Sequence, residues 1–244
     1  SPELKGKVAI VTGSSRGIGK AIALGLAGRG CRVVVTARTA EQGNVPGTIH
    51  ETAEEVCGLG GDVLPIRCDV TDEASVQKMV DAVLAQWGEI HILINNAGVG
   101  SYLPFLETPV KVWDRIMAVN LRGTFLCTRA VLPHMVERRR GRILNISSFA
   151  ANSVFSLTTP KEGGHTLIGI AYGLSKAGIE RLTTGLAAEM GKHNIAVNAI
   201  KPARPVLTEA LMTHLPQANS EEWATPDAMV RAARGYSNLE LDLE

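Results

Sequence analysis

Short apolar runs recur along the chain, and each of them is closed by residues that favour turns. The runs are rich in Val and Ile. Continuous apolar runs of this length predict strands that are buried on both faces. The predicted strands span residues 8–13, 32–37, 62–68, 91–98, 141–148 and 195–202.

Between these strands, apolar residues recur with the spacing of one helix face. The predicted helices span residues 17–29, 48–60, 72–87, 109–138 and 172–192. The alternation of strand and helix predicts an α/β protein, with a mostly parallel sheet covered by helices on both faces. Residues 1–244 contain no repeat and no break in composition, so we expect a single doubly wound domain.

Two long segments interrupt this alternation, residues 149–171 and residues 203–235. Both follow predicted strands, and the ligands of open parallel sheets bind beyond the carboxyl ends of the strands. Long loops at that edge are more often functional than not. We therefore expect both segments to border a substrate site.

The charge balance excludes several classes of partner. The 25 basic and 24 acidic side chains nearly cancel, so no strong field attracts nucleic acid or an anionic membrane. No apolar stretch reaches membrane-spanning length, and no leader pattern precedes the first strand. The cysteines are widely spaced and the histidines lack metal-ligand spacing, so neither a disulfide framework nor a metal site is predicted. These features favour a soluble cytoplasmic protein.

The first predicted strand runs into a glycine-rich turn, "VAIVTGSSRGIG". Gly13 can adopt a turn conformation that is barred to other residues. Gly17 and Gly19 remove side chains where the backbone approaches a phosphate and where the helix packs on the strand. The helix N-terminus then offers free N–H groups to a pyrophosphate. The alternative is a plain strand–helix turn, but three glycines directly after an apolar strand favour a dinucleotide site.

The second predicted strand indicates which dinucleotide is bound. An acidic residue about 20 residues after the glycines would bind the ribose hydroxyls of NAD. Ala37 stands there instead, Arg38 follows it, and Arg16 lies inside the glycine turn. Two guanidinium groups near the ribose favour the 2′-phosphate of NADP over NAD, unless both arginines face solvent.

Tyr172 and Lys176 lie four residues apart at the start of a predicted helix and therefore share one face of it. They can be ordinary surface residues. Alternatively, the ammonium can lower the pKa of the phenol, from about 10, toward a value suited to proton transfer at neutral pH.

Seven motifs resemble those of the short-chain dehydrogenase/reductase family in order and spacing, over roughly residues 5 to 210. They are "TGSSRGIG" (12–19), "DVTD" (69–72), "NNAG" (95–98), "MAVNLRGTF" (117–125), "ILNISS" (143–148), "YGLSK" (172–176) and "VNAIKP" (197–202). The stretch "PGTIHETAEEV" resembles the hydroxysteroid-dehydrogenase-like branch. The resemblance implies a Rossmann-type fold, a nicotinamide cofactor and hydride exchange between an alcohol and a ketone or aldehyde.

The resemblance also implies roles for individual residues. Tyr172 is the general acid and base, Lys176 lowers its pKa, Ser148 holds the substrate oxygen, and Asn120 anchors a water. Asp69 and Val70 contact the adenine, and Thr208 reaches the nicotinamide. The full set of implied cofactor-binding residues is Gly13, Ser15, Arg16, Gly17, Ile18, Gly19, Arg38, Asp69, Val70, Asn96, Ala97, Gly98, Tyr172, Lys176, Pro202 and Thr208.

Three features depart from the family pattern. Ser148 and Tyr172 are 24 residues apart, and Thr159 lies nearer the usual distance. We assign the role to Ser148, because an enlarged loop can bulge outward without moving its ends. Ala203 replaces a glycine of the family, which affects the assignment of Thr208. A last strand over residues 237–243 is only weakly indicated.

We expect an NADP-dependent carbonyl reductase that also runs as an alcohol dehydrogenase. The competing hypothesis is a redox-inactive NADP(H) sensor or scaffold. A lipophilic carbonyl substrate is expected from the apolar residues of the loops, together with residues 203–235. These apolar residues are Phe105, Leu106, Phe149, Phe155 and Leu157. Apolar stripes with small residues on the helices 109–138 and 172–192 predict a homodimer or homotetramer.

Overall fold

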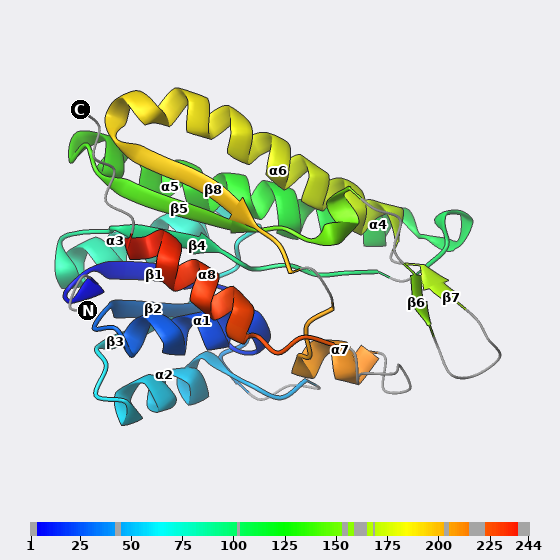
Figure 1. The fold of residues 1–244 in the computed structure, drawn as a ribbon, viewed down its shortest axis with the longest axis horizontal. Helices are drawn as coiled ribbons and strands as arrows, with labels where there is room; N and C mark the ends of the chain where they lie inside the picture. Colours follow the sequence, from blue (N-terminus) through cyan, green and yellow to red (C-terminus); the bar gives the residue numbers. More distant parts are fainter. Residues whose placement is uncertain are drawn as a thin grey trace.

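The main feature of the computed structural model is a six-stranded parallel sheet in the order β3-β2-β1-β4-β5-β8 (Figure 1). The strands are β1 Val8–Thr12, β2 Arg32–Ala37, β3 Val63–Arg67, β4 Ile92–Asn95, β5 Gly141–Ile146 and β8 Ile195–Ile200. The residues that the structure describes are 4–41, 45–101, 103–152, 156–158, 165–167, 169–202, 205–214 and 223–238. All six strands predicted from apolar runs are confirmed.

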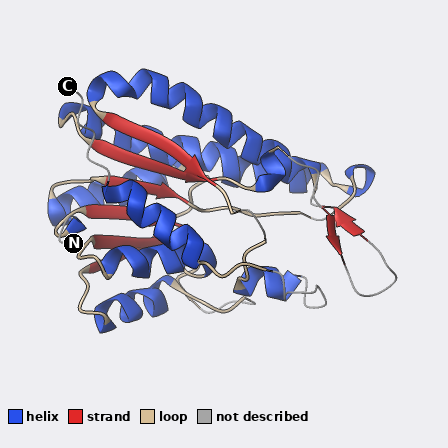
Figure 2. Ribbon diagram, in the orientation of Figure 1, coloured by secondary structure: helices blue, strands red, loops and turns tan. Residues whose placement is uncertain are grey.

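Helices cover both faces of this sheet (Figures 1 and 2). One face carries α1, α2 and α8, and the other carries α3, α5 and α6. The helices are α1 Gly17–Ala27, α2 Ile49–Gly58, α3 Glu73–Trp87, α4 Val110–Ile116, α5 Gly123–Glu137, α6 Ile170–Met190, α7 Glu209–His214 and α8 Asp227–Asn238. The doubly wound α/β fold is therefore as expected.

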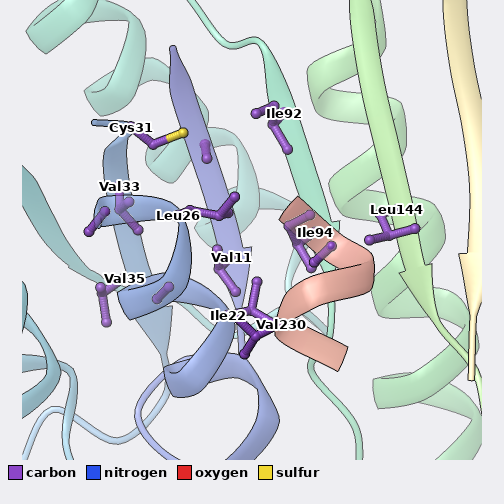
Figure 3. Packing of buried hydrophobic residues seen from close by; sticks show 14 of the residues in the cluster. Val11, Ile22, Leu26, Cys31, Val33, Val35, Ile92, Ile94, Leu144 and Val230 are labelled. Carbon is purple, nitrogen blue, oxygen red and sulfur yellow. The ribbon is translucent and has the colours of Figure 1, made fainter. Parts of the chain in front are cut away.

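Successive residues of the central strands point into two separate apolar layers. In β1, Val11 packs against the layer of α1 and α8, where Leu26 and Val230 also lie (Figure 3). Val8 and Ile10 pack against the opposite layer. Every residue of β1 is buried. This double burial explains why the strands are continuous apolar runs in the sequence.

The helix predicted over residues 109–138 is divided in three. A short π-helical segment, Met117–Arg122, separates α4 from α5. Within it, the main-chain oxygen of Asn120 accepts a hydrogen bond from the Thr124 hydroxyl at 2.7 Å. Such π segments occur frequently at functional sites.

Segment 149–171 is only partly described. It begins with a 3-10 turn, Phe149–Ala151, and contains an antiparallel pair, β6 Ser156–Thr158 and β7 His165–Leu167, that is separate from the main sheet (Figure 2). Phe155, Thr159 and Ala203 lie outside the described residues, so the predictions made for them stay predictions.

The strand expected over residues 237–243 is wrong at its start, because Ser237 and Asn238 end helix α8. The rest of that range lies outside the described residues. Met229, Val230, Ala233 and Tyr236 are buried at helical spacing, which drives this segment to a helix. Among the described residues, no helix has the length and apolar character needed to cross a membrane.

Candidate active site

A cavity of about 630 Å³ opens beyond the carboxyl ends of the strands. The order of the strands reverses between β1 and β4, and ligands of doubly wound sheets bind at such a switch point. Of the residues expected to bind cofactor or substrate, those lining the cavity are Gly13, Ser15, Arg16, Gly17, Ile18, Arg38, Asp69, Val70, Asn96, Ala97, Gly98, Ser148, Tyr172, Lys176, Pro202 and Thr208.

The glycine turn joins β1 to α1. Gly13 and Gly17 have φ values of +65° and +58°, in the region that favours glycine. A Cβ on Gly13 would lie 2.7 Å from the Cα of Ala97, so the turn packs closely on the end of β4. Gly19 does not line the cavity, and its contact with the cofactor stays a prediction. A Cβ there would lie 2.4 Å from the carbonyl oxygen of Gly13, so Gly19 serves the packing of the helix on the turn.

The segment after β4 is tied to this turn by side-chain hydrogen bonds. The Asn96 amide donates to the carbonyl oxygens of Thr12 and Gly13, both at 3.0 Å. The Thr12 hydroxyl accepts from the N–H groups of Asn96 and Ala97, at 3.0 and 3.1 Å. These bonds fix the spacing between the ends of β1 and β4, where the backbone lines the cavity.

The first N–H of α1 already has an acidic partner. The Gly17 N–H donates to a carboxylate oxygen of Glu209, at the start of α7, over 2.9 Å. Thr208 lies next to it, and its Cγ2 would be 3.2 Å from a Cβ on Gly17. The chain thus brings its own anionic group to the N–H that we expected to bind a phosphate. No local pattern predicts this contact, because Glu209 lies 192 residues away from Gly17 along the chain.

Positive charges gather near the end of β2. Arg16 donates from Nη2 to the carbonyl oxygen of Gly47 at 2.8 Å. Arg38 lines the cavity beside Asp69, whose carboxylate accepts bonds from the Thr71 N–H at 2.9 Å and hydroxyl at 2.7 Å. Partial burial opposes ionisation of Asp69, but the Thr71 bonds and the charge of Arg38 hold its pKa below the usual value.

Ser148 and Tyr172 converge from different elements. Ser148 follows β5 and caps the turn Phe149–Ala151, while Tyr172 lies in the first turn of α6. A hydrogen bond joins their side chains. The prediction that Tyr172 has a lowered pKa is wrong in this structure, because burial raises the pKa and the bond from Ser148 offsets this only in part.

Lys176 is buried one turn further along α6. Its ammonium donates to the carbonyl oxygen of Ile146 at 2.7 Å and lies 5.7 Å from the centre of the Tyr172 ring. Burial lowers the pKa of Lys176 from 10.5 to about 8. The lysine is therefore mostly charged at neutral pH and loses its charge in mildly alkaline solution.

Asn120 does not line the cavity. Its amide accepts from the Val99 N–H at 2.8 Å and donates to the Val99 carbonyl and to the Ser175 hydroxyl, both at 2.9 Å. Asn120 thus holds the segment after β4 against α6, next to Lys176 on that helix. The expected water held by Asn120 stays a prediction.

The cavity has apolar walls that the sequence identified only in part. Phe149 lines it as expected, whereas Phe105 and Leu106 are largely exposed and do not. The cavity is also lined by one face of α4 and the π segment, which the sequence analysis did not identify. The residues of this face are Val112, Arg115, Ile116 and Val119. Their i, i+3, i+4, i+7 spacing was a readable signal for one helix face. Within the part of the chain that the structure describes, no group of His, Cys, Asp or Glu side chains could hold a metal ion.

Residues 7–219 match the family model for short chain dehydrogenases. The chain belongs to the short-chain dehydrogenase/reductase family. It is 37% identical over 210 residues to hydroxysteroid dehydrogenase-like protein 2 of Danio rerio and 38% identical over 209 residues to that of Homo sapiens. These matches cover 86% and 85% of this chain but 48% of each relative, so the chain spans about half the length of these curated relatives.

Solved structures of family members share the fold. A short-chain dehydrogenase/reductase from Mycobacterium marinum is 30% identical with a TM-score of 0.84, covering 97% of this chain and 90% of its own. A metagenomic short-chain oxidoreductase in complex with NADP is 32% identical with a TM-score of 0.78, covering 98% of this chain and 93% of its own. The family uses a nicotinamide cofactor, and the cavity of about 630 Å³, lined by Gly13, Gly17 and Ile18 of the glycine turn, fits such a dinucleotide.

Proposed function

We propose that this chain exchanges a hydride between NADP(H) and a carbonyl or alcohol substrate, with Tyr172 as the general acid and base. The observation that carries the proposal is that one cavity is lined both by the glycine turn and by Ser148, Tyr172 and Lys176. When bound, the nicotinamide supplies or accepts the hydride, while the protein supplies binding, orientation and the proton.

In the direction of reduction, the Tyr172 phenol donates its proton to the carbonyl oxygen of the substrate. The Tyr172 phenol is protonated at neutral pH, which is the form that this direction requires. Burial raises its pKa and so makes it a weaker acid, which a nearby positive charge has to offset. As the proton leaves, the Lys176 ammonium, 5.7 Å from the centre of the ring, stabilises the phenolate. The Ser148 hydroxyl donates to the same substrate oxygen, and donors placed in this way contribute roughly 3 kcal/mol in other enzymes.

The preference for NADP rests on Arg16 and Arg38. Both line the cavity, and Ala37 stands where an acidic residue would repel a 2′-phosphate. One nitrogen of Arg16 already donates to Gly47, so we expect the guanidinium group of Arg38 to make the bidentate contact with the phosphate. The apolar residues Val99, Phe149, Val206 and Leu211, which also line the cavity, favour a lipophilic carbonyl compound as the substrate.

The decisive experiment compares the wild type with Tyr172→Phe. We expect the wild type to oxidise NADPH in the presence of members of a ketone and aldehyde panel. Loss of general acid catalysis in Tyr172→Phe should lower kcat by about a hundredfold or more. A fluorescence titration should give the same NADPH Kd for both proteins and a weaker Kd for NADH. Undiminished turnover in Tyr172→Phe would refute the mechanism, and turnover on no substrate would favour the sensor hypothesis.

A further inference from the structure

Helix α6 carries a third polar residue on the face of Tyr172 and Lys176. Glu180 lies four residues after Lys176, so the three side chains follow one another along the same side of the helix. The Glu180 carboxylate accepts a hydrogen bond from the Ser147 hydroxyl at 2.8 Å and pairs with the Lys201 ammonium at 3.2 Å. Its side chain is 27% exposed, so this contact lies at the edge of the core.

These bonds gather three segments that border the cavity. Ser147 is buried and directly precedes Ser148 at the end of β5. Lys201 directly precedes Pro202 after β8, and its ammonium also donates to the Asn152 side chain, which follows the turn Phe149–Ala151. The Ser147 N–H donates to the carbonyl oxygen of Ile200 at 2.8 Å, which extends the pairing of β5 and β8.

The charge of Glu180 suits this arrangement. Partial burial opposes ionisation, but the bonds from Ser147 and Lys201 keep its pKa below the usual value. The carboxylate is therefore ionised at neutral pH and bonded to a buried hydroxyl. Hydrogen bonds to charged groups are stronger than neutral ones, so the contact resists displacement of the strand end.

The turn after Ser148 is packed closely on the same helix. A Cβ on Gly173, the residue after Tyr172, would lie 2.8 Å from the carbonyl oxygen of Ala150. This contact lies on one side of Ser148 in the sequence, and the Glu180–Ser147 bond lies on the other. The segment that carries Ser148 is thus fixed to α6 at two points, and α6 also carries Tyr172.

From this geometry, and resting on the function proposed above, we propose that Glu180 is a positioning residue that holds the Ser148 hydroxyl at the Tyr172 phenol. Glu180 acts through Ser147, which is adjacent to Ser148 in the chain. The same carboxylate, through Lys201, fixes the start of the segment that contains Pro202.

The first test is Glu180→Ala in the whole chain, with Glu189→Ala as its control. Glu189 is an exposed acidic residue of the same helix. We expect kcat to fall about tenfold in Glu180→Ala, which corresponds to about 1.4 kcal/mol of lost transition-state positioning. The NADPH Kd, measured by fluorescence, should stay within about twofold of the wild type, because the glycine turn is untouched. An unchanged kcat, or an equal loss in Glu189→Ala, overturns the proposal.

The second test asks whether Glu180 acts through Ser148. In a Ser148→Ala background there is no hydroxyl left to position, so Glu180→Ala should cause no further loss of kcat. A loss that multiplies with that of Ser148→Ala shows that Glu180 acts elsewhere and overturns the proposal. Ser147→Ala keeps the Glu180–Lys201 pair. It should also lower kcat in the wild type and cause no further loss in the Ser148→Ala background, so it replaces Glu180→Ala in this test if that variant folds poorly. A wild type without turnover, or Tyr172→Phe with full turnover, refutes the proposed function itself.

Discussion

At the scale of single residues, Lys176 combines burial with charge, and this should make stability depend on pH. Its pKa is about 8 in the folded chain and 10.5 in the reference state. Between these values the unfolded chain binds more protons than the folded one, so stability rises with pH. Below the folded pKa the cost of burying the ammonium is complete and no longer changes.

The matching measurement compares the wild type with Lys176→Met. From about pH 7.5 to about pH 9.5, the free energy of unfolding of the wild type should rise relative to the variant by roughly 2 kcal/mol. Chemical denaturation at each pH measures both proteins, and groups other than Lys176 cancel in the difference. The lost bond to Ile146 is a constant offset that does not depend on pH. If the difference in the free energy of unfolding between the two proteins stays constant or falls with pH, burying the charged Lys176 side chain does not destabilise the fold.

Glu209 should influence how tightly the cofactor binds. Its carboxylate accepts from the Gly17 N–H, the group on which we expect the pyrophosphate to dock. Glu209→Gln keeps an acceptor but removes the negative charge, so the Kd of NADPH should fall by about threefold, as befits an exposed charge. Isothermal calorimetry measures this, with Glu137→Gln at the exposed end of α5 as the control. Weaker binding in Glu209→Gln would mean that the carboxylate supports the bound state.

At the scale of elements, the sheet was predictable because every strand contributes side chains to both apolar layers and stands out as an apolar run. The C-terminal segment was not. The end of the chain, "LELDLE", alternates like a strand, whereas the helix spacing of Val230, Ala233 and Tyr236 lies just before it. Tertiary contacts of Tyr236 stabilise the helix, since its hydroxyl donates to the carbonyl oxygens of Ile143 and Ala196. Such partners cannot be read from local sequence.

The packing of α8 on α1 makes two helical glycines behave oppositely. A Cβ on Gly25 would lie 2.4 Å from Cγ1 of Val230, whereas one on Gly235 would meet nothing within 4 Å. Gly235→Ala should stabilise the chain by up to about 1 kcal/mol through helix propensity. Gly25→Ala should destabilise it by roughly 1–3 kcal/mol, because overpacking outweighs that gain. The midpoint of thermal unfolding should rise for Gly235→Ala and fall for Gly25→Ala. A rise for both variants would mean that α8 can shift away from α1 without a loss of stability.

At the scale of the whole molecule, the candidate site draws on nearly every strand end. Sequence motifs located Ser148, Tyr172 and Lys176 because their types and spacing are diagnostic as a set. Motifs did not disclose Glu209, which bonds to the glycine turn from the start of α7, or Arg115, which lines the cavity from α4. They also gave the wrong direction for the pKa of Tyr172, because burial is a property of the assembled fold.

The expected self-association also belongs to the whole molecule. Helices α4, α5 and α6 are neighbours on one side of the sheet (Figure 1) and leave Val110, Phe125 and Leu174 75%, 46% and 48% exposed. Large apolar side chains that stay exposed on neighbouring helices offer contacts to a partner. Gly178, one of the small residues of this face, instead packs against Leu121 of the same chain.

We therefore expect light scattering at micromolar concentration to give at least twice the chain mass of 25.9 kDa. Phe125→Glu should shift the protein toward the monomer, because an interface would have to bury an unpaired carboxylate. Leu59→Glu, at a site 61% exposed beyond the end of α2, should leave the mass unchanged. Both positions are exposed, so neither charge should unfold the chain, and unchanged thermal midpoints would verify this. A monomeric wild type would refute the association, whereas equal dissociation by both variants would place the interface elsewhere.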